Sequence, residues 1–210
     1  MSSKRYGQFC GLARSLDRVG ERWTLLIIRE LLTGDRTYVE LLRALPGLAT
    51  NVLAGRLRDL EEAGILERVG ARRRKGGRYR LSTLGHGLEP AILALIRWGS
   101  VWMQQGPGSD YIEDGWAPLA VKAVLEGAAA GKKTGAVEFR VGTAAPFSVV
   151  VNDGRREVRP ASASLPDAVV FAASLPDLLA AVSTGAVGAS AGLRIEGDRS
   201  LARQATSAAS

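Results

Sequence analysis

Cysteine and histidine are almost absent from this sequence of 210 residues, which holds one of each, Cys10 and His86. A single cysteine excludes a disulfide within the chain, and the usual structural zinc sites need more of both residue types. A Cys–His or Ser–His–Asp catalytic site would have to use these same two residues. We therefore expect no metal site, no cofactor and no enzymatic activity.

Long apolar runs are also missing. No segment approaches the roughly 18–20 uninterrupted apolar residues of a transmembrane helix, and the first residues lack the apolar core of a signal peptide. Hydrophobic residues still make up 46% of the chain and charged residues 23%, the balance of an ordinary globular protein. The sequence therefore predicts a globular protein of the cytoplasm with no membrane partner.

Charge is distributed unevenly along the chain, whose formal net charge is +7. Residues 1–105 hold 18 Lys and Arg against 10 Asp and Glu, a balance of +8, whereas residues 106–210 hold 10 against 11, a balance of −1. A Gly-Pro-Gly-Ser break separates the two halves. We expect a basic domain over 1–105 with an anionic partner, a linker over 106–115 and a second domain over 116–210. The alternative is a chance asymmetry within one domain.

The first half has the pattern of a helical array that ends in a hairpin. Apolar residues at helical spacing predict helices over about 10–19, 23–32, 38–45 and 50–63, and a last long helix over 84–105. Thr37 and Glu40 have the spacing of a capping box, and Thr50 is the expected N-cap of the fourth helix. Two short β segments, 65–69 and 78–81, flank a Gly-Gly turn. This order of elements predicts a winged helix-turn-helix.

The fourth helix and the hairpin supply the residues that we expect to contact double-stranded DNA. Small or hydrogen-bonding residues at the start of the helix suit base edges, and four consecutive cations at the hairpin tip suit phosphates. The expected DNA-binding residues are Arg36, Tyr38, Thr50, Asn51, Ala54, Arg56, Arg58, Arg72, Arg73, Arg74, Lys75 and Arg78. The alternative for the tip is a solvated charged loop, which the basic balance of the whole half disfavours.

Residues 10–99 resemble HxlR-type bacterial transcription regulators, a branch of the MarR-like winged helices. The resemblance rests on the stretches C-G-L-A-R-S-L-D-R-V-G-E-R-W-T-L-L-I-I-R-E-L-L, Y-V-E-L-L-R-A-L-P-G-L, L-A-G-R-L-R-D-L-E-E-A-G-I-L, Y-R-L-S-T-L-G-H-G-L and R-W-G. It implies a homodimer, joined largely through its end helices, on a pseudo-palindromic operator. It also aligns Cys10 with a cysteine through which some relatives sense oxidants or electrophiles, although a free cysteine is often just a small buried hydrophobe.

The second half mixes strands with helices. Its apolar spacing predicts helices over 116–130 and 175–184, a last helix after residue 198, and strands near 137–141, 147–151, 157–159, 167–173 and 193–198. Asn152-Asp153-Gly154 is a typical tight turn between two of these strands. The mixture predicts an α+β domain.

The stretches F-S-V-V-V-N-D-G, D-A-V-V-F-A-A-S-L-P-D-L-L-A-A-V-S-T-G and G-L-R-I-E-G-D resemble the sterol-carrier-protein-like fold. That resemblance implies an antiparallel sheet and helices that enclose an apolar tunnel. The tunnel either binds an uncharged apolar small molecule as an effector or is closed and serves dimerisation. The residues expected to line it are Trp116, Phe147, Val149, Val151, Val169, Phe171, Leu178, Leu179, Val182, Leu193 and Ile195.

The function predicted from these features is a homodimeric, DNA-binding transcription regulator of α+β class. The alternative is a carrier of lipids or hydrophobic metabolites that uses its winged helix only to dimerise, but a carrier has no need of four consecutive cations. We expect His86 at the surface or at an interface. We expect Trp23 and Trp98 in the core or a dimer contact, and Trp102 and Trp116 in the core, between the domains or along a pocket.

Overall fold

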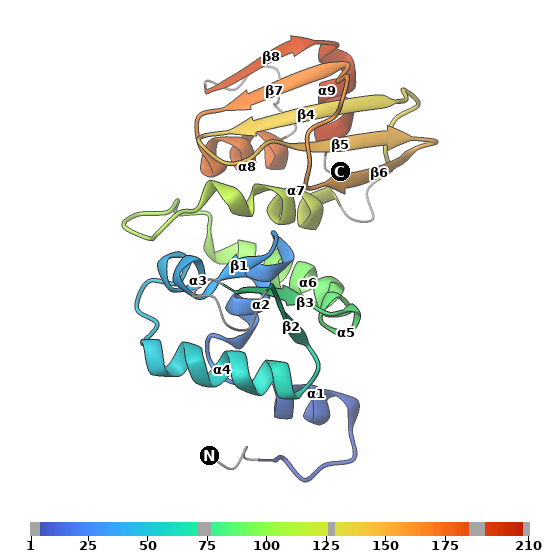
Figure 1. Ribbon diagram of the computed structural model, residues 1–210. Helices are drawn as coiled ribbons and strands as arrows, with labels where there is room; N and C mark the ends of the chain where they lie inside the picture. Colours follow the sequence, from blue (N-terminus) through green and yellow to red (C-terminus); the bar gives the residue numbers. More distant parts are fainter. Residues whose placement is uncertain (1–4, 71–76, 126–128, 185–191, 208–210) are drawn as a thin grey trace. The chain divides into compact units, whose positions relative to one another are not determined.

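A computed structural model describes residues 5–70, 77–125, 129–184 and 192–207 of the chain (Figure 1). The chain divides into two compact units, Met1–Ile92 and Leu93–Ser210. The four cations expected at the hairpin tip, Arg72, Arg73, Arg74 and Lys75, lie outside the described residues.

The first unit is a winged helix-turn-helix. Its elements are α1 (Gly11–Val19), α2 (Thr24–Leu32), β1 (Arg36–Thr37), α3 (Tyr38–Ala44), α4 (Thr50–Glu62), β2 (Leu66–Val69), β3 (Arg78–Leu81), α5 (Thr83–His86) and the start of α6 (Glu89–Gly99). The strands form an antiparallel sheet in the order β1-β3-β2, and the two-residue strand β1 was not predicted. Ile27, Leu41 and Leu57, one from each of α2, α3 and α4, are buried in its core.

The expected continuous helix over 84–105 is wrong, because the chain breaks it between α5 and α6. Gly85 explains the first part of the break: a Cβ there would lie 2.1 Å from the carbonyl oxygen of Ile65, so only glycine allows this close approach. Gly87 then ends α5, and Pro90 lies in the first turn of α6, where a missing N–H costs nothing. After Gly99 the chain tightens into a 3-10 turn, η1 (Ser100–Trp102).

The second unit is a five-stranded sheet with helices. After η1 come η2 (Asp114–Trp116), α7 (Ala117–Leu125), β4 (Gly135–Val141), β5 (Phe147–Asn152), β6 (Arg155–Arg159), β7 (Ala168–Ala172), α8 (Leu175–Thr184), β8 (Leu193–Gly197) and α9 (Arg199–Thr206). The strand order is β6-β5-β4-β7-β8, visible in Figure 1. Asp153 and Gly154, with φ of 47° and 72°, form the tight turn predicted between β5 and β6.

The expected antiparallel sheet is wrong in one respect, because the sheet is mixed. β4 pairs antiparallel with β5 but parallel with β7. The physical reason is the connection after β6: the chain leaves one edge of the sheet and returns beyond β4, and such a crossover produces a parallel pair. Fold class α+β holds for the described elements, and none of the described helices is long and apolar enough to span a bilayer.

Candidate nucleic-acid interface

The turn from α3 into α4 is fixed by local hydrogen bonds. The Thr37 hydroxyl accepts from the Glu40 N–H at 3.2 Å, and Glu40 Oε2 accepts from the Thr37 N–H at 2.6 Å, which confirms the predicted capping box. The Tyr38 hydroxyl donates to the carbonyl oxygen of Thr50 at 2.7 Å and so joins the start of α3 to the start of α4. Thr50 is not the N-cap of α4, because Ala49 takes that position and α4 has no side-chain cap.

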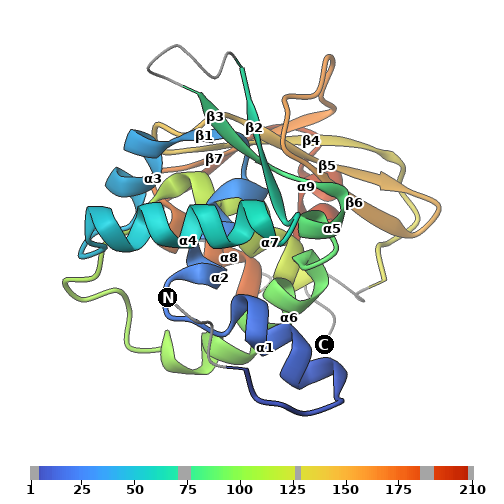
Figure 2. The same ribbon diagram turned by 60° about the horizontal axis from the view of Figure 1, so that its bottom comes forward.

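Helix α4 shows one apolar and one open face. Leu53, Leu57 and Leu60 are buried against the unit, whereas Asn51 and Arg58 are exposed. Positions 51, 54, 55 and 58 follow helical spacing, so half-buried Ala54 and Gly55 lie between Asn51 and Arg58 on one stripe. Figure 2 shows α4 across the front of this unit, with β2 and β3 beside it. The stripe combines two hydrogen-bonding side chains with two small residues that let the helix approach a groove closely.

Three of the arginines expected at DNA are engaged within the protein. Arg36 is half-buried and donates to the Thr33 hydroxyl at 3.0 Å. Arg56 pairs with Asp59 at 3.1 Å, and Arg78 pairs with Glu40 at 3.3 Å. Arg58 differs from them, because it makes no ion pair with any residue that the structure describes.

Sequence reasoning missed the acidic partners at the base of the wing. Asp35 and Glu40 face Arg80 and Arg78 of β3, and Arg80 was not among the expected residues. The available signal was the alternation on β3, since residues 78 and 80 of one strand point to the same side. The short strand β1, which brings the acids alongside, gave too little sequence pattern to be found.

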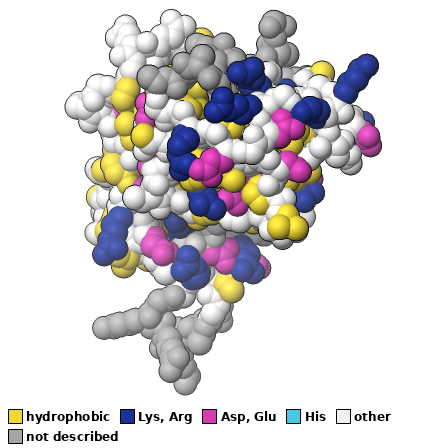
Figure 3. All heavy atoms as spheres, turned by 90° about the horizontal axis from the view of Figure 1, so that it is seen from above, with side chains coloured by type: hydrophobic (Ala, Val, Ile, Leu, Met, Phe, Trp, Pro, Cys, Tyr) yellow, Lys and Arg dark blue, Asp and Glu magenta, His cyan; other side chains and the backbone are white. Residues whose placement is uncertain are grey.

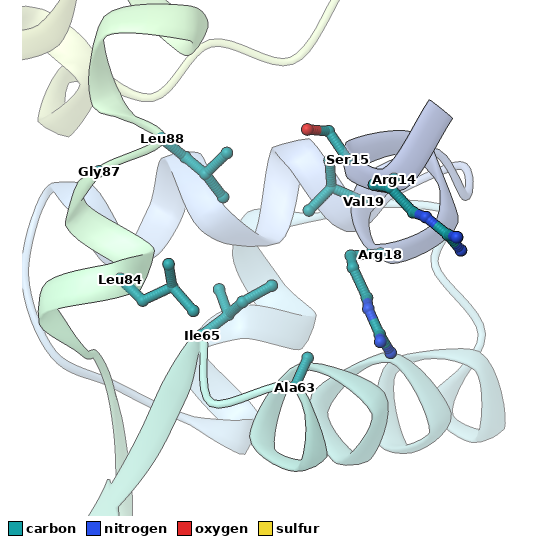
Figure 4. Close-up of a pocket in the computed structure, with 9 residues that line it drawn as sticks. All are labelled: Arg14, Ser15, Arg18, Val19, Ala63, Ile65, Leu84, Gly87 and Leu88. Carbon is teal, nitrogen blue, oxygen red and sulfur yellow. The ribbon is translucent and has the colours of Figure 1, made fainter. Parts of the chain in front are cut away.

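A pocket of about 460 Å³ opens at the other end of α4 (Figure 4). The side chains of Val19, Ile65, Leu84 and Leu88 converge on it, and Arg18 lies along one side near Ala63. No residue of the exposed α4 stripe lines this pocket, so it is separate from the candidate DNA-contacting surface.

Most residues expected to line a tunnel in the second unit belong to its core. Phe139 stacks on Phe147 with ring centroids 5.0 Å apart, and both are buried. Phe147, Val149, Val151, Leu178 and Val182 are buried in this cluster, and Trp116, Leu179, Leu193 and Ile195 are partly buried against it. These side chains pack in one buried cluster on one face of the sheet.

The expectation that Val169 and Phe171 face the same interior is wrong. On β7, the buried residues are Ala168, Val170 and Ala172, so the residues between them point to the opposite face. There the Arg194 guanidinium lies 3.8 Å from the centroid of the Phe171 ring. The sequence was ambiguous here because every residue of this strand is apolar.

Three arginines on the strands of the second unit each pair with a glutamate two residues away on the same strand. Arg140 pairs with Glu138 at 2.8 Å, Arg159 with Glu157 at 2.7 Å, and Arg194 with Glu196. Figure 3 shows Lys and Arg interspersed with Asp and Glu rather than gathered in one patch on the face in view.

The isolated reactive residues form no cluster. Cys10 is exposed just before α1, and hydrogen bonds from the backbone of Ala13 and Leu12 lower the pKa of its thiol. His86 is exposed at the end of α5. Within the described part of the chain, no three His, Cys, Asp or Glu side chains are placed to share a metal ion.

The tryptophans separate into two groups. Trp23 and Trp116 are half-buried, whereas Trp98 and Trp102 are about two-thirds exposed, at 67% and 66%. The core positions considered for Trp98 and Trp102 are therefore wrong. Trp98 and Trp102 contact each other edge to face, with ring centroids 4.7 Å apart.

Comparison with known proteins bears on the first half of the chain. A family model described as HxlR-like helix-turn-helix matches residues 18–107. An uncharacterised HTH-type transcriptional regulator of Synechocystis sp. is 36% identical over 100 residues, which cover 47% of this chain and 74% of that protein. The chain belongs to the HxlR-like helix-turn-helix family.

Other HxlR-like relatives match over a similar length. An uncharacterised HTH-type transcriptional regulator of Mycobacterium tuberculosis is 40% identical over 98 residues, which cover 46% of this chain and 61% of that protein. Similar solved structures include the redox regulator HypR in its reduced form, at 26% identity and a TM-score of 0.42 over 46% of this chain and 96% of that one. The reduced form of YodB from Bacillus subtilis is 27% identical, with a TM-score of 0.40 over 47% and 99% of the two chains. Family membership makes this HxlR-like chain a transcription regulator.

Proposed function

We propose that the chain binds double-stranded DNA sequence-specifically, with α4 in the major groove. The carrying observation is the exposed α4 stripe from Asn51 to Arg58. An asparagine amide is suited to adenine, and an arginine is suited to guanine or a phosphate. The small residues Ala54 and Gly55 leave little side-chain bulk between Asn51 and Arg58, which suits close contact of the helix with base edges. Tyr38 holds the start of α4 by donating its one hydroxyl proton to the Thr50 carbonyl, so a phosphate contact by Tyr38 would require it to exchange that hydrogen bond.

The positive balance of residues 1–105 supports the same proposal. Cations that displace counterions from DNA supply affinity that does not depend on sequence. Arg72, Arg73, Arg74 and Lys75, between β2 and β3 in the sequence, are the proposed phosphate contacts of the wing.

We propose further that the regulator is a homodimer. On α1, Leu12 is 69% exposed and Leu16 lies one turn later on the same side; at the end of α6 and in η1, Trp98 and Trp102 are exposed. Large apolar side chains gathered on a helix are typical of an association surface. A two-fold dimer would present two α4 helices to successive major grooves, about 34 Å apart.

For the second unit we propose a sterol-carrier-like fold, which rests on the sequence stretches that resemble it; the mixed sheet differs from the antiparallel sheet that the resemblance implied. The contacts among the residues expected to line its tunnel favour a filled core that stabilises the regulator over an effector cavity. The carrier alternative receives no support from these contacts.

The proposal is tested by selecting duplexes from a random library with the purified chain and titrating the best one by fluorescence anisotropy. Each phosphate contact contributes about −0.9 to the slope of log affinity against log salt, so a dimer should give a slope of roughly −4 or steeper. Analytical ultracentrifugation of the free protein and of the complex gives the number of chains bound. Failure of a folded protein to enrich any sequence at low salt would contradict the DNA-binding proposal, and a monomeric complex would contradict the homodimer.

A further inference from the structure

Two arginines at the base of the wing contact acidic residues from an earlier part of the chain. Arg78 and Arg80 are two residues apart on β3, so they point to the same side, while Tyr79 between them is buried. Arg80 Nε donates to both carboxylate oxygens of Asp35, at 3.0 and 3.1 Å, and its Nη2 donates to Oδ2 at 2.6 Å. Such a two-pronged arginine–carboxylate pair fixes direction as well as distance.

Arg78 contacts two acidic residues at once. Its Nη2 donates to the backbone carbonyl oxygen of Asp35 and lies 3.3 Å from Oε2 of Glu40. The same Glu40 oxygen accepts from the Thr37 N–H in the capping box of α3. One carboxylate therefore serves both the first turn of α3 and the wing strand.

The backbone pairing of the segment between Asp35 and Glu40 with β3 is short, so it contributes little to fixing the wing strand. β1 is only two residues long, and it pairs Arg36 with Tyr79 and Thr37 with Arg78. Both carboxylates are ionised near neutral pH, and their contacts favour that form, since the Arg80 hydrogen bond lowers the pKa of Asp35 and the Thr37 N–H lowers that of Glu40. The side chains of Asp35, Glu40, Arg78 and Arg80, here called the wing latch, thus supplement a minimal strand pair.

We propose that Asp35 and Glu40 are positioning residues that set the direction of the wing relative to α3 and α4. Arg78 and Arg80 act on these two acids and not on DNA. The inference rests on the proposed DNA-binding function, since the direction of the hairpin decides whether the wing meets the backbone while α4 occupies the groove. It assigns to two acidic residues a role in the affinity for an anionic partner.

The first measurement uses the free protein and does not depend on DNA. Hydrogen exchange of the Arg78–Leu81 amides is compared between wild type, D35N and E21Q. Glu21 is an exposed acid between α1 and α2 that makes no ion pair with any described residue, so E21Q matches the charge change and leaves the latch intact. We expect faster exchange of the β3 amides in D35N alone. Unchanged exchange in D35N would overturn the latch, whether or not the chain binds DNA.

The second measurement is affinity for the selected duplex. D35N should weaken binding by about tenfold, the effect of losing roughly one charged hydrogen bond, while E21Q should not weaken it. R80D should lower the affinity for the duplex by a similar factor. The swapped pair D35R/R80D should recover most of that affinity because the ion pair is restored in reverse. A swap that binds as poorly as R80D would show that Arg80 contacts DNA itself and would overturn the proposal.

E40Q is the second variant in case D35N does not fold, as judged by circular dichroism. A glutamine still accepts from the Thr37 N–H, so the capping box survives while the charge facing Arg78 is lost. We expect E40Q to weaken binding by a smaller factor than D35N with an unchanged melting temperature. An unchanged affinity in E40Q would remove Glu40 from the latch. If wild type itself enriches no duplex, the proposed function fails while the exchange result still decides whether the latch exists.

Discussion

Arginines on three strands of the second unit, β4, β6 and β8, differ from Arg58 on α4 of the first unit in whether a carboxylate neutralises them. On the strands of the second unit, Arg140, Arg159 and Arg194 each pair with a glutamate two residues away on the same strand. On α4 of the first unit, Arg58 makes no such pair with a described residue and lies on an exposed stripe with Asn51. A net positive balance is therefore only part of the evidence for a nucleic-acid partner. Which arginines are already neutralised decides where that partner can bind.

The wing latch adds a third use of charge. Arg78 and Arg80 belong to the basic unit, yet their contacts are internal. Exposed ion pairs are usually weak, but a two-pronged pair within a network holds a direction that a single contact does not. In the first unit, Arg78 and Arg80 are thus engaged internally, whereas Arg58 is exposed for the proposed contact with DNA.

The largest difference between the units should appear in stability. Phe139→Ala removes a fully buried ring of the second unit and should lower the free energy of unfolding by about 3–5 kcal/mol. Urea unfolding measures the loss, and DNA affinity of the folded fraction should stay unchanged. Phe171→Ala, on the other face of the sheet, is the control and should cost roughly 1 kcal/mol or less. Equal losses for the two variants would contradict the assignment of inner and outer faces.

DNA discrimination should depend on the first unit alone. Asn51→Ala should lower the preference for the selected duplex over one with a changed base pair by ~1–3 kcal/mol, because a good base contact is lost. Arg194→Gln in the second unit should leave both affinities unchanged. Anisotropy titrations with the two duplexes check this. Equal weakening on both duplexes by Asn51→Ala would show that α4 is not the reading helix.

The cap of α3 in the first unit should matter more than the cap of α8 in the second unit. Thr37→Ala removes the cap of α3 and should cost about 1 kcal/mol of unfolding free energy. Ser174→Ala at the start of α8 should cost less, because Asp114 Oδ1 still accepts from the Leu175 N–H at 2.8 Å. Thermal unfolding of the two variants under one buffer condition compares them. A larger loss for Ser174→Ala would reverse this ranking.

The smallest effect should be a pH dependence in the second unit. The Lys133 ammonium and the N–H groups of α9 hold the pKa of Asp198 well below its ordinary value. A carboxylate with a lowered folded pKa stabilises fully above its unfolded pKa of about 4, and this stabilisation is lost as the pH falls through the folded value. Asp198→Asn keeps a good cap but loses the charge. The stability difference between wild type and variant should therefore be constant above about pH 5 and shrink below about pH 4, as urea unfolding at several pH values would show. A difference that persists unchanged at pH 3 would exclude this charge as its source.

Periodicity predicted the helices and strands of the chain well where one face is buried and the other is polar. The capping box at Thr37, the Asp153-Gly154 turn and α8 follow from residue types whose local preferences are strong. The faces of β7 were not predictable, because an all-apolar strand contains no alternation to read. The break before α6 depends on the approach of Gly85 to Ile65, a contact between distant residues that spacing along a helix does not reveal.

The sequence predicted which residues of the candidate site are exposed better than it predicted which residues they contact. The α4 stripe follows from helical spacing, and the structure places Asn51 and Arg58 on its exposed face. The engagement of Arg36, Arg56 and Arg78 within the protein depends on partners that only the folded chain brings near. Arginines that look equivalent in a sequence therefore differ in what they can bind.

The parallel pair of β4 and β7 has a consequence for synthesis on the ribosome. β4, β5 and β6 are made first and form a three-stranded meander, in which β4 lies at an open edge until β7 emerges. The edge strands of the complete sheet, β6 and β8, carry charged residues such as Arg155, Arg159 and Glu196, which discourage pairing with another chain. The inner strand β4 has the sequence G-A-V-E-F-R-V, with apolar residues that only the finished core covers. If the ribosome pauses between β6 and β7, β4 stays exposed with one edge unpaired. Translation speed at that point should therefore influence how much of the protein is recovered in soluble form.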